Sequence, residues 1–364
     1  MRARSELRNL DQTVLLSTLA LLAIGLLVLY SASFQKLPSN GADYLSRQLT
    51  WMSLGGVLAA VLVLVDYHRW LELSYWLYGL GVVFLVVVLE MGVVRGGAQR
   101  WLSFGPVSIQ PSEFAKIATI LALSRYLGAR RDPGSPKLRT ILGACVLLLV
   151  PMGLILMQPN LGTASIFGVV GMGMLLVWGI PLRALLGVLG AGVAAIPIGW
   201  HFLADYQRSR LLVFINPNLD PLGAGYTVIQ SKIAMGSGFL FGKGWLSGTQ
   251  SRLNFLPERH TDFIFSVVGE EWGFLGTSVC LGLFAFFCVR SLRIAVETRD
   301  PYGRLLVVGL VTMLAIHTVV NVGMSVGMMP VVGLPLPFLS YGGSWLLTTL
   351  VAVGMILSVS VRRP

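Results

Sequence analysis

The sequence predicts an all-α polytopic membrane protein in which about ten transmembrane helices form a single integral membrane domain over residues 1–364. Hydrophobic residues make up 55% of the chain and charged residues only 12%, whereas a soluble domain carries about 25% charged residues. Apolar runs long enough to cross about 30 Å of hydrocarbon as helices recur along the chain. This composition leaves too little polar surface for a water-soluble fold, so we expect a bilayer to surround the protein.

Ten apolar segments have the length of a membrane-spanning helix. The first follows Arg2, Arg4 and Arg8 and ends near small residues, as a signal peptide would, but many similar segments follow it and we interpret it as a retained helix. The predicted spans are 12–33, 48–65, 73–94, 111–127, 138–156, 160–178, 182–203, 263–289, 303–329 and 338–361. An even number of spans places both termini on the same side of the membrane.

The basic residues fall between these spans. The formal net charge is +11, but no soluble domain carries the basic stripe that would indicate nucleic-acid binding. The side that holds the termini carries Arg2, Arg4, Arg8, Arg69, Arg125, Arg130, Arg131, Lys137, Arg139, Arg183, Arg290, Arg293, Arg299, Arg304, Arg362 and Arg363. The short segments opposite carry only Lys36, Arg47, Arg95 and Arg100. Because cytoplasmic loops are enriched in Lys and Arg, both termini are predicted to be cytoplasmic.

One connection is far longer than the others. Residues 204–262 separate the seventh and eighth predicted spans and lie outside the cytoplasm under this topology. Loops of this length are usually functional when they are ordered. This one contains a glycine-rich stretch, residues 236–248, and an amphipathic piece from Tyr226 to Met235 that could lie on the membrane surface. A lid or a partner platform above a site in the membrane would suit a loop of this size.

Nucleotide-driven chemistry is not indicated. The run GSGFLFGKGW fails as a P-loop because three residues, not four, separate Gly238 from Gly242, and Gly244 stands where Ser or Thr is required. The four histidines lack zinc-site spacing. We therefore expect an activity on the outer face that needs no nucleotide.

Ionisable and polar residues inside the predicted spans are candidates for function because they are costly in hydrocarbon. Glu113 and Lys116 are three residues apart on one helix face and can pair, either as a packing ion pair or as part of a site. His317 and Asn321 favour an interhelical hydrogen bond. The pair Glu270–Glu271 could form a proton or cation relay or contact a neighbouring helix, and the sequence leaves this open.

Asp262 stands where the long loop meets the eighth span. Partial burial there would raise the pKa of its carboxyl group toward the range of a general base. The alternative is that Asp262 caps the N-terminus of the helix that follows it. From the residues alone, both roles remain open.

Four long segments resemble, in order, the signature motifs of the SEDS family (shape, elongation, division and sporulation). They are RWLSFGPVSIQPSEFAK (100–116), QPNLGT (158–163), the pair GAGYTVIQSKIAMGSGFLFGKGW and LNFLPERHTDFIFSVVGEEWGFLG (223–245 and 253–276), and NVGMSVGMMPVVGLPLPFLSYGGS (321–344). The resemblance covers nearly the whole chain. The segments IQSKIA and GTQSRLNFLPERHTDF are more similar to the elongation branch, RodA, than to the division branch, FtsW.

The resemblance implies a peptidoglycan glycosyltransferase with ten transmembrane helices in the bacterial cytoplasmic membrane. Lipid II and a growing lipid-linked glycan would meet in an outward-facing cavity. The HTDF motif makes Asp262 the family's essential carboxylate, and the QPSEFAK segment brings Glu113, Lys116 and the upstream Trp101 to the cavity. Two residues depart from the family: Asn160 replaces the usual aspartate of QPNLGT, and Trp345 follows SYGGS where a small residue is commoner.

These residues suggest an inverting displacement of polyprenyl pyrophosphate by the 4-hydroxyl of the acceptor sugar. Our hypothesis makes Asp262 the base, with His260 as a rival, and gives Glu113 the task of orienting Lys116. Lys116 would stabilise the leaving group electrostatically. The basic residues of the long loop that could assist it are Arg210, Lys243 and Arg259. A divalent cation, Mg²⁺ or Mn²⁺, could replace or assist them.

The resemblance also implies partners, namely a class B penicillin-binding protein with transpeptidase activity and the rest of the elongation machinery. Two other functional classes fit much of the sequence. A lipid II flippase would show similar buried charges, although the chain lacks the paired broken spans found in two halves of many transporters. A non-catalytic scaffold that activates a transpeptidase is the other alternative.

Overall fold

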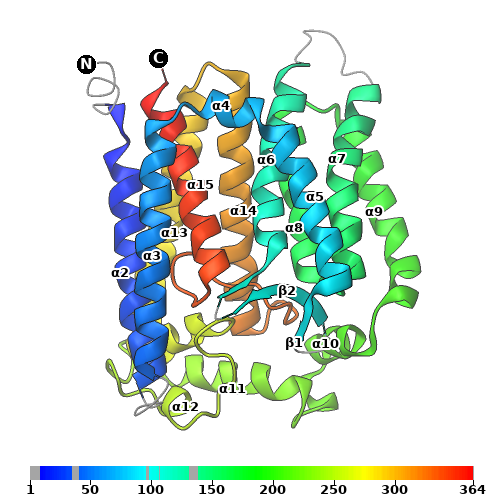
Figure 1. Ribbon diagram of the computed structural model, residues 1–364. Coiled ribbons are helices and arrows are strands. Elements are labelled where there is room, and N and C mark those ends of the chain that lie inside the picture. The colour runs from blue at the N-terminus through cyan, green and yellow to red at the C-terminus, as the bar shows by residue number, and fades with distance from the viewer. Residues whose placement is uncertain (1–8, 35–40, 96–97, 106, 131–137, 364) are drawn as a thin grey trace.

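The computed structural model describes residues 9–34, 41–95, 98–105, 107–130 and 138–363. Six of the basic residues that predict the topology lie outside these ranges, namely Arg2, Arg4, Arg8, Lys36, Arg131 and Lys137. Ten helices of 18 residues or more run through the described part of the chain and form one bundle (Figure 1). They are α2 (Gln12–Ser33), α3 (Gly41–Leu64), α5 (Ser74–Met91), α6 (Pro111–Gly128), α7 (Leu138–Met157), α8 (Leu161–Trp178), α9 (Leu182–Phe202), α13 (Ile264–Glu297), α14 (Pro301–Val326) and α15 (Gly343–Val361).

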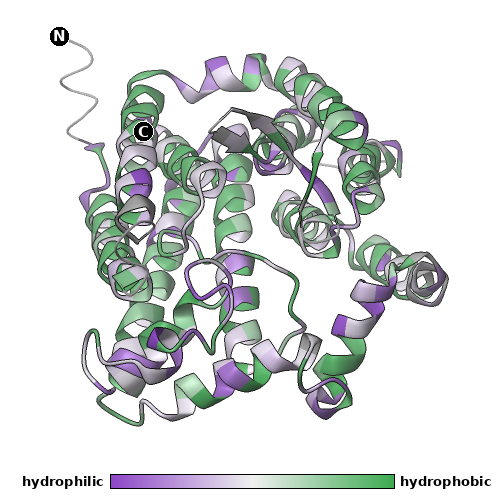
Figure 2. Cartoon of the chain, turned by 60° about the horizontal axis from the view of Figure 1, so that its bottom comes forward, coloured by the Kyte–Doolittle hydropathy of each residue, from purple (hydrophilic) through white to green (hydrophobic). Residues whose placement is uncertain are grey.

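The ten predicted spans therefore each correspond to a helix. Nine of the described helices are long and apolar enough to cross a membrane, and the protein is a multi-pass membrane protein. The exception, α6, carries Glu113, Lys116 and Arg125. Most of its residues, including Glu113 and Lys116, are buried among the other helices, so its polar groups avoid the hydrocarbon. Figure 2 shows apolar residues along the long helices and polar residues gathered on the short helices and connections.

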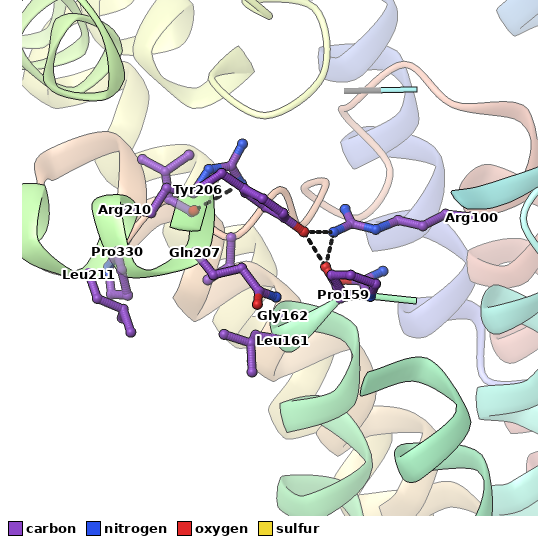
Figure 3. Close-up of a pocket in the computed structure, with 12 residues that line it drawn as sticks. Arg100, Pro159, Leu161, Gly162, Tyr206, Gln207, Arg210, Leu211 and Pro330 are labelled. Carbon is purple, nitrogen blue, oxygen red and sulfur yellow. Dashed lines mark hydrogen bonds between the residues drawn. The ribbon is translucent and has the colours of Figure 1, made fainter. Parts of the chain in front are cut away.

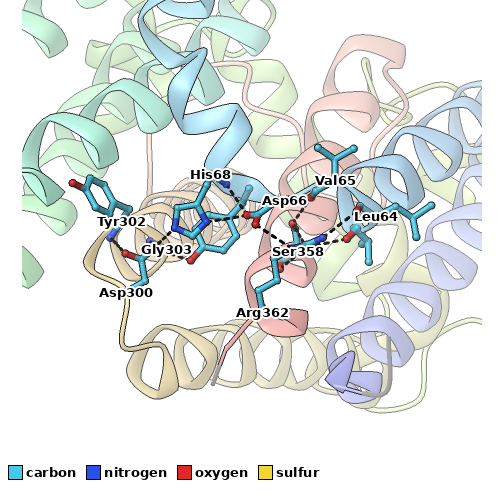
Figure 4. A network of polar contacts seen from close by, with 11 residues as sticks. Leu64, Val65, Asp66, His68, Asp300, Tyr302, Gly303, Ser358 and Arg362 are labelled. Carbon is cyan, nitrogen blue, oxygen red and sulfur yellow. Dashed lines mark hydrogen bonds and ion pairs between the residues drawn. The ribbon is translucent and has the colours of Figure 1, made fainter. Parts of the chain in front are cut away.

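The start of α2 and the end of α15 lie at the same end of the bundle, as the even number of spans requires (Figure 1). A polar network ties this end together around the short helix α4 (Tyr67–Glu72) (Figure 4). His68 Nδ1 lies 2.9 Å from Asp66, and His68 Nε2 lies 3.4 Å from Asp300. Asp300 in turn caps α14 by accepting from the backbone N–H of Gly303 at 2.8 Å.

At the opposite end, the connection between α5 and α6 forms a small antiparallel sheet that the all-α prediction missed. Strands β1 (Val93–Arg95), β2 (Ala98–Phe104) and β3 (Val107–Ile109) lie in the order β1-β2-β3. Val93 pairs with Trp101, and Leu102 pairs with Ile109. The strands are too short for an alternation of apolar and polar residues to stand out in the sequence.

The long connection between α9 and α13 contains four short helices that lie at the same end as the sheet (Figure 1). They are α10 (Asp205–Ile215), the 3₁₀ helix η3 (Pro217–Leu219), α11 (Ala224–Gly236) and α12 (Thr249–Arg252). Helix α11 includes the amphipathic piece expected from Tyr226 to Met235. This segment is therefore mostly helical, and it lies against the ends of the long helices.

Helix α13 is longer than its predicted span and is broken near its start. Its 34 residues would extend about 51 Å as a continuous helix, but Gly273 leaves helical geometry with φ 65° and ψ −160°. The glycine-rich stretch, residues 236–248, satisfies the backbone groups that the break exposes. The N–H of Phe274 donates to the carbonyl of Phe239 at 2.8 Å, and the N–H of Lys243 donates to the carbonyl of Glu270 at 3.0 Å. Backbone without such partners would be costly at membrane depth.

Candidate active site

Asp262 lies in a tight turn just before α13. The backbone carbonyl of Glu258 accepts hydrogen bonds from the N–H groups of both Thr261 and Asp262 at 3.1 Å. The N-cap of α13 is Phe263 and has no side-chain cap, so the capping role left open for Asp262 is wrong. Its carboxylate is instead available for other interactions.

The loop of residues 327–342, between α14 and α15, holds this turn in place. Ser340 Oγ donates to the carbonyl of Thr261 at 2.5 Å, and the N–H of Tyr341 donates to the carbonyl of His260 at 2.9 Å. Gly333, with φ 71°, lies opposite the Asp262 carboxylate, because a Cβ added there would be 3.5 Å from Asp262 Oδ2. A left-handed backbone conformation favours glycine at this position.

The surroundings of Asp262 alter its proton affinity. Burial and the negative charge of Glu258 raise the pKa of its carboxyl group, the positive charges of Arg210 and Arg100 lower it, and the net result is a pKa of about 6. In the described part of the chain, the carboxylate makes no hydrogen bond or ion pair of its own. At neutral pH it is thus mainly ionised and able to accept a proton.

A small pocket of about 30 Å³ lies between α10, the start of α8 and the 327–342 loop (Figure 3). Asp262 does not line it, but the same loop carries Gly333, which lies opposite the Asp262 carboxylate. Its lining residues are Arg100, Pro159, Asn160, Leu161, Gly162, Tyr206, Gln207, Arg210, Leu211, Pro330, Val331 and Val332. Both arginines that act on Asp262 line this pocket. It combines two positive charges with apolar walls, a combination that suits an anionic ligand attached to an apolar chain.

Each arginine is fixed by backbone oxygens. Arg100, from β2, contacts the carbonyl of Pro159 and donates from Nη2 to the hydroxyl of Tyr206 at 2.9 Å. Arg210, from α10, donates to the carbonyl of Val331 at 3.2 Å. Because carbonyl oxygens carry no full charge, both guanidinium groups keep their net positive charge in the pocket. Arg210 was predicted as a site residue from the sequence, whereas Arg100 and Tyr206 were not.

Glu113 and Lys116 do not line this pocket. They pair at 2.9 Å inside the bundle, where each side chain is almost fully buried. Lys116 Nζ also lies 2.9 Å from His317 Nε2 and 4.6 Å from the centre of a ring of Trp345, which stacks on His317 at 3.9 Å. The structure therefore places Lys116 within an interior polar cluster, and it gives Trp345 a role in covering that cluster.

Lys243 and the two glutamates of α13 belong to the helix break. Glu270 accepts from Lys243 Nζ at 3.0 Å and from the backbone N–H groups of Gln250 and Ser251, at 2.8 Å and 3.1 Å. Glu271 contacts the hydroxyl of Ser31 on α2. Both carboxylates hold neighbouring segments, which favours the packing interpretation over a relay.

The remaining candidates lie around the turn that carries Asp262. Arg259 is buried and donates to the carbonyl of Ala32 at 2.7 Å and to Asn254 Oδ1 at 2.5 Å, so it anchors the turn to the end of α2. The ring of His260 lies 4.8 Å from that of Tyr44. Trp101 is half-buried in β2, next to Arg100. Among the described residues, no three His, Cys, Asp or Glu side chains gather as a metal site.

Comparison with known proteins identifies the family. Residues 12–364 match the cell cycle protein family of FtsW, RodA and SpoVE. The chain belongs to this family, the SEDS family. Over 360 residues it is 43% identical to the peptidoglycan glycosyltransferase MrdB of Escherichia coli K12, covering 98% of this chain and 94% of MrdB.

Solved structures agree with this assignment. The SEDS protein superposes with a TM-score of 0.83 and 34% identity on a chain of a peptidoglycan synthase complex that coordinates polymerisation and crosslinking, covering 97% of this chain and 98% of the other. It superposes with a TM-score of 0.73 and 32% identity on the crystal structure of the rod shape determining protein RodA of Thermus thermophilus, covering 97% of both chains. The similarity extends over the whole fold.

Within this SEDS protein, Asn160 performs a task that does not need a carboxylate. Its Oδ1 accepts from the backbone N–H of Thr163 at 3.2 Å and so caps α8. Asn and Asp serve almost equally well as helix N-caps. Asn160 therefore keeps the N-cap of α8 although it replaces the usual aspartate.

Proposed function

We propose that this SEDS protein polymerises lipid II into glycan strands during cell elongation, with Asp262 as the general base. The similarity to MrdB, a peptidoglycan glycosyltransferase, and to RodA supports the reaction class. The observation that carries the residue assignment is the arrangement of one partly buried, otherwise unpaired carboxylate beside a pocket with two arginines.

In the proposed step, the 4-hydroxyl oxygen of the acceptor sugar attacks the anomeric carbon of the donor. Asp262 takes the hydroxyl proton as the new C–O bond forms. The bond from the anomeric carbon to polyprenyl pyrophosphate breaks, and the leaving group departs with the electron pair. Arg100 and Arg210 stabilise the negative charge that develops there. Direct displacement inverts an α-linked donor to a β-linked product without a covalent sugar intermediate.

This assignment moves the leaving-group role away from Lys116. Lys116 lies in the cluster with Glu113, His317 and Trp345, whereas both arginines line the pocket and act on the charge of Asp262. In the proposal, Glu113 and Lys116 support the packing of α6 against α14 beneath the site. His260 stays the rival base, and its ring packs against those of Tyr44 and Tyr341.

The proposed site faces the outside of the bacterial cytoplasmic membrane, and both termini are cytoplasmic. The basic residues of the sequence support this orientation, because most of them fall on the side that holds the termini. The sheet and the 204–262 segment lie at the other end of the bundle (Figure 1), and residues of β2 and α10 there line the pocket. Lipid II would then reach the pocket from the outer leaflet.

The proposed partner is a class B penicillin-binding protein acting as transpeptidase within the elongation machinery. The similarity to a chain of a synthase complex that couples polymerisation with crosslinking supports this. A divalent cation, Mg²⁺ or Mn²⁺, is an alternative to charge stabilisation by the arginines alone; Asp262 would hold it, and it would neutralise negative charge on the leaving group. Among the described residues, no group of three His, Cys, Asp or Glu side chains surrounds a cation position.

The test is polymerisation of labelled lipid II by the purified protein with its transpeptidase partner, read as glycan ladders on a gel. We expect ladders from the wild-type protein and none from Asp262→Asn, which keeps the shape of the side chain but cannot accept the proton. Ladders of normal length from Asp262→Asn would overturn the base assignment. Absence of ladders from the wild type, together with transfer of lipid II across vesicles, would indicate a flippase instead.

A further inference from the structure

Asn321 is a fully buried polar residue on α14 that contacts the turn carrying Asp262. Its side-chain nitrogen donates to the backbone carbonyl of Asp262 at 2.9 Å and to the backbone carbonyl of Leu334 at 2.8 Å. Its side-chain oxygen is buried without a hydrogen-bond partner in the part of the chain that the structure describes. The amide nitrogen therefore makes both bonds and bridges two segments that are far apart in the sequence.

The second segment, the 327–342 loop, forms much of the surroundings of the Asp262 carboxylate. Its Gly333 lies opposite Asp262 Oδ2, and its Val331 carbonyl holds Arg210 at 3.2 Å. One turn away from Asn321 on α14, His317 Nδ1 lies 3.3 Å from the carbonyl of Pro335 in the same loop. Asn321 thus fixes the backbone of Asp262 relative to the loop that holds one of the charges acting on it.

We propose that Asn321 is a positioning residue, whose two hydrogen bonds set the place of the Asp262 carboxylate relative to Gly333 and Arg210. The inference rests on the proposed role of Asp262 as the base. Asn321 does not touch the substrate and acts through the backbone. A displacement of about 1 Å at a reacting group can cost about 10²-fold in rate. Loss of these two hydrogen bonds should therefore lower kcat.

The chemistry of the side chain explains why asparagine is needed. The backbone carbonyls of Asp262 and Leu334 both accept a hydrogen bond from the same short side chain. A primary amide carries the two N–H donors that these bonds require. A leucine of similar size donates nothing, and an aspartate would place a negative charge against two carbonyl oxygens. Asn321→Leu therefore removes both bonds while it keeps the number and branching of the side-chain heavy atoms.

The experiment compares wild type, Asn321→Leu and Asn321→Asp with a matched control, Thr318→Val. Thr318 is a buried residue of the same helix whose hydroxyl donates to the carbonyl of Leu314 within α14. The full-length proteins, with the partner, are assayed with labelled lipid II over a range of pH, and rates are normalised to the folded fraction measured by thermal unfolding. We expect both Asn321 variants to lose about 10²-fold in kcat with KM changed less than about threefold, and Thr318→Val to behave as wild type.

The pH profile separates positioning from a general effect on folding. The charges of Glu258, Arg210 and Arg100 act on the Asp262 carboxylate. The pH of the acid limb of kcat/KM therefore depends on where the carboxylate lies among them. In Asn321→Leu the turn can move toward solvent, which shifts the acid limb of kcat/KM to lower pH. A normal kcat per folded molecule with an unchanged limb would overturn the inference.

A further variant, Asp262→Asn, separates this inference from the proposed function. If Asp262→Asn is inactive and Asn321→Leu retains wild-type kcat, the positioning role alone is wrong. If Asp262→Asn retains wild-type activity, the base assignment is wrong and the positioning role is wrong with it.

Discussion

At the scale of single residues, the site depends on charge held in fixed places by neutral partners. Arg100 and Arg210 are bound by carbonyl and hydroxyl oxygens, so neither is neutralised by a carboxylate before the substrate arrives. We expect Arg210→Gln to lower kcat about 10²-fold, because one preorganised donor to the leaving group is lost. The measurement is the rate of lipid II consumption at saturating substrate.

The matched control is Arg208→Gln on the same helix. The Arg208 guanidinium donates hydrogen bonds to the carbonyls of Trp200 and His201, and it does not line the pocket. Its substitution should leave kcat within about twofold of wild type. Equal losses in both variants would indicate a general effect of charge on α10.

Residue roles could be predicted from the sequence only where a motif or a topological position marked them. Asp262 stood at the junction of loop and span, and Arg210 lay in the long loop. Arg100 is one of the few basic residues on the side poor in positive charge, and this isolation is the signal in the sequence that marks it. The distance between Lys116 and the pocket could not be predicted, because it depends on how α6 packs against α14.

At the scale of elements, the break in α13 links the site to the glycine-rich stretch. Glu270 is fully buried and accepts hydrogen bonds from Lys243 and from two backbone N–H groups of α12. We expect Glu270→Ala to lower the free energy of unfolding by about 2 kcal/mol, because it leaves two backbone donors unpaired and removes the carboxylate from the partly exposed Lys243. Thermal unfolding in detergent measures the change.

A surface carboxylate provides the comparison for Glu270. Glu297, at the end of α13, is about half exposed and pairs with Arg290 and Arg363. An exposed pair contributes about 0–1 kcal/mol, so Glu297→Ala should be nearly neutral. Equal free energies of unfolding for Glu270→Ala and Glu297→Ala would contradict the role of Glu270 in holding the segment between α11 and α13.

Hydropathy predicted the ten long helices well, because each needs a continuous apolar run. It did not reveal the true extent of α13, because Arg290 and Arg293 interrupt the apolar run although the helix continues to Glu297. The break at Gly273 was equally hidden, because the backbone groups it frees are satisfied by Phe239 and Lys243, more than 25 residues earlier in the chain. Long-range pairing of this kind leaves no local pattern.

At the scale of the whole molecule, the position of the pocket relative to the termini determines which leaflet supplies the substrate. We expect Leu222→Cys, in the exposed part of the 204–262 segment, to react with a membrane-impermeant thiol reagent added to spheroplasts. Glu72→Cys, exposed on α4 at the end that holds the termini, should react only after the membrane is opened. Both variants are made with Cys145, Cys280 and Cys288 replaced by Ala.

The opposite labelling pattern would invert the topology and with it the source of lipid II. The charge distribution predicts the orientation from the sequence, because the rule concerns loops and not packing. The shape of the pocket could not be predicted, because it forms where β2, α8, α10 and the 327–342 loop meet.

The measurement that tests the central claim most directly is the pH dependence of kcat/KM in wild type and Glu258→Gln. Deprotonated Asp262 is the active form of the base, and burial and Glu258 raise its pKa to about 6, so activity should fall as the pH drops through about 6. Removing the negative charge of Glu258 should shift this limb to lower pH, because less repulsion opposes ionisation of Asp262. A limb far from pH 6, or one that Glu258→Gln leaves in place, would contradict the assignment of Asp262 as the base.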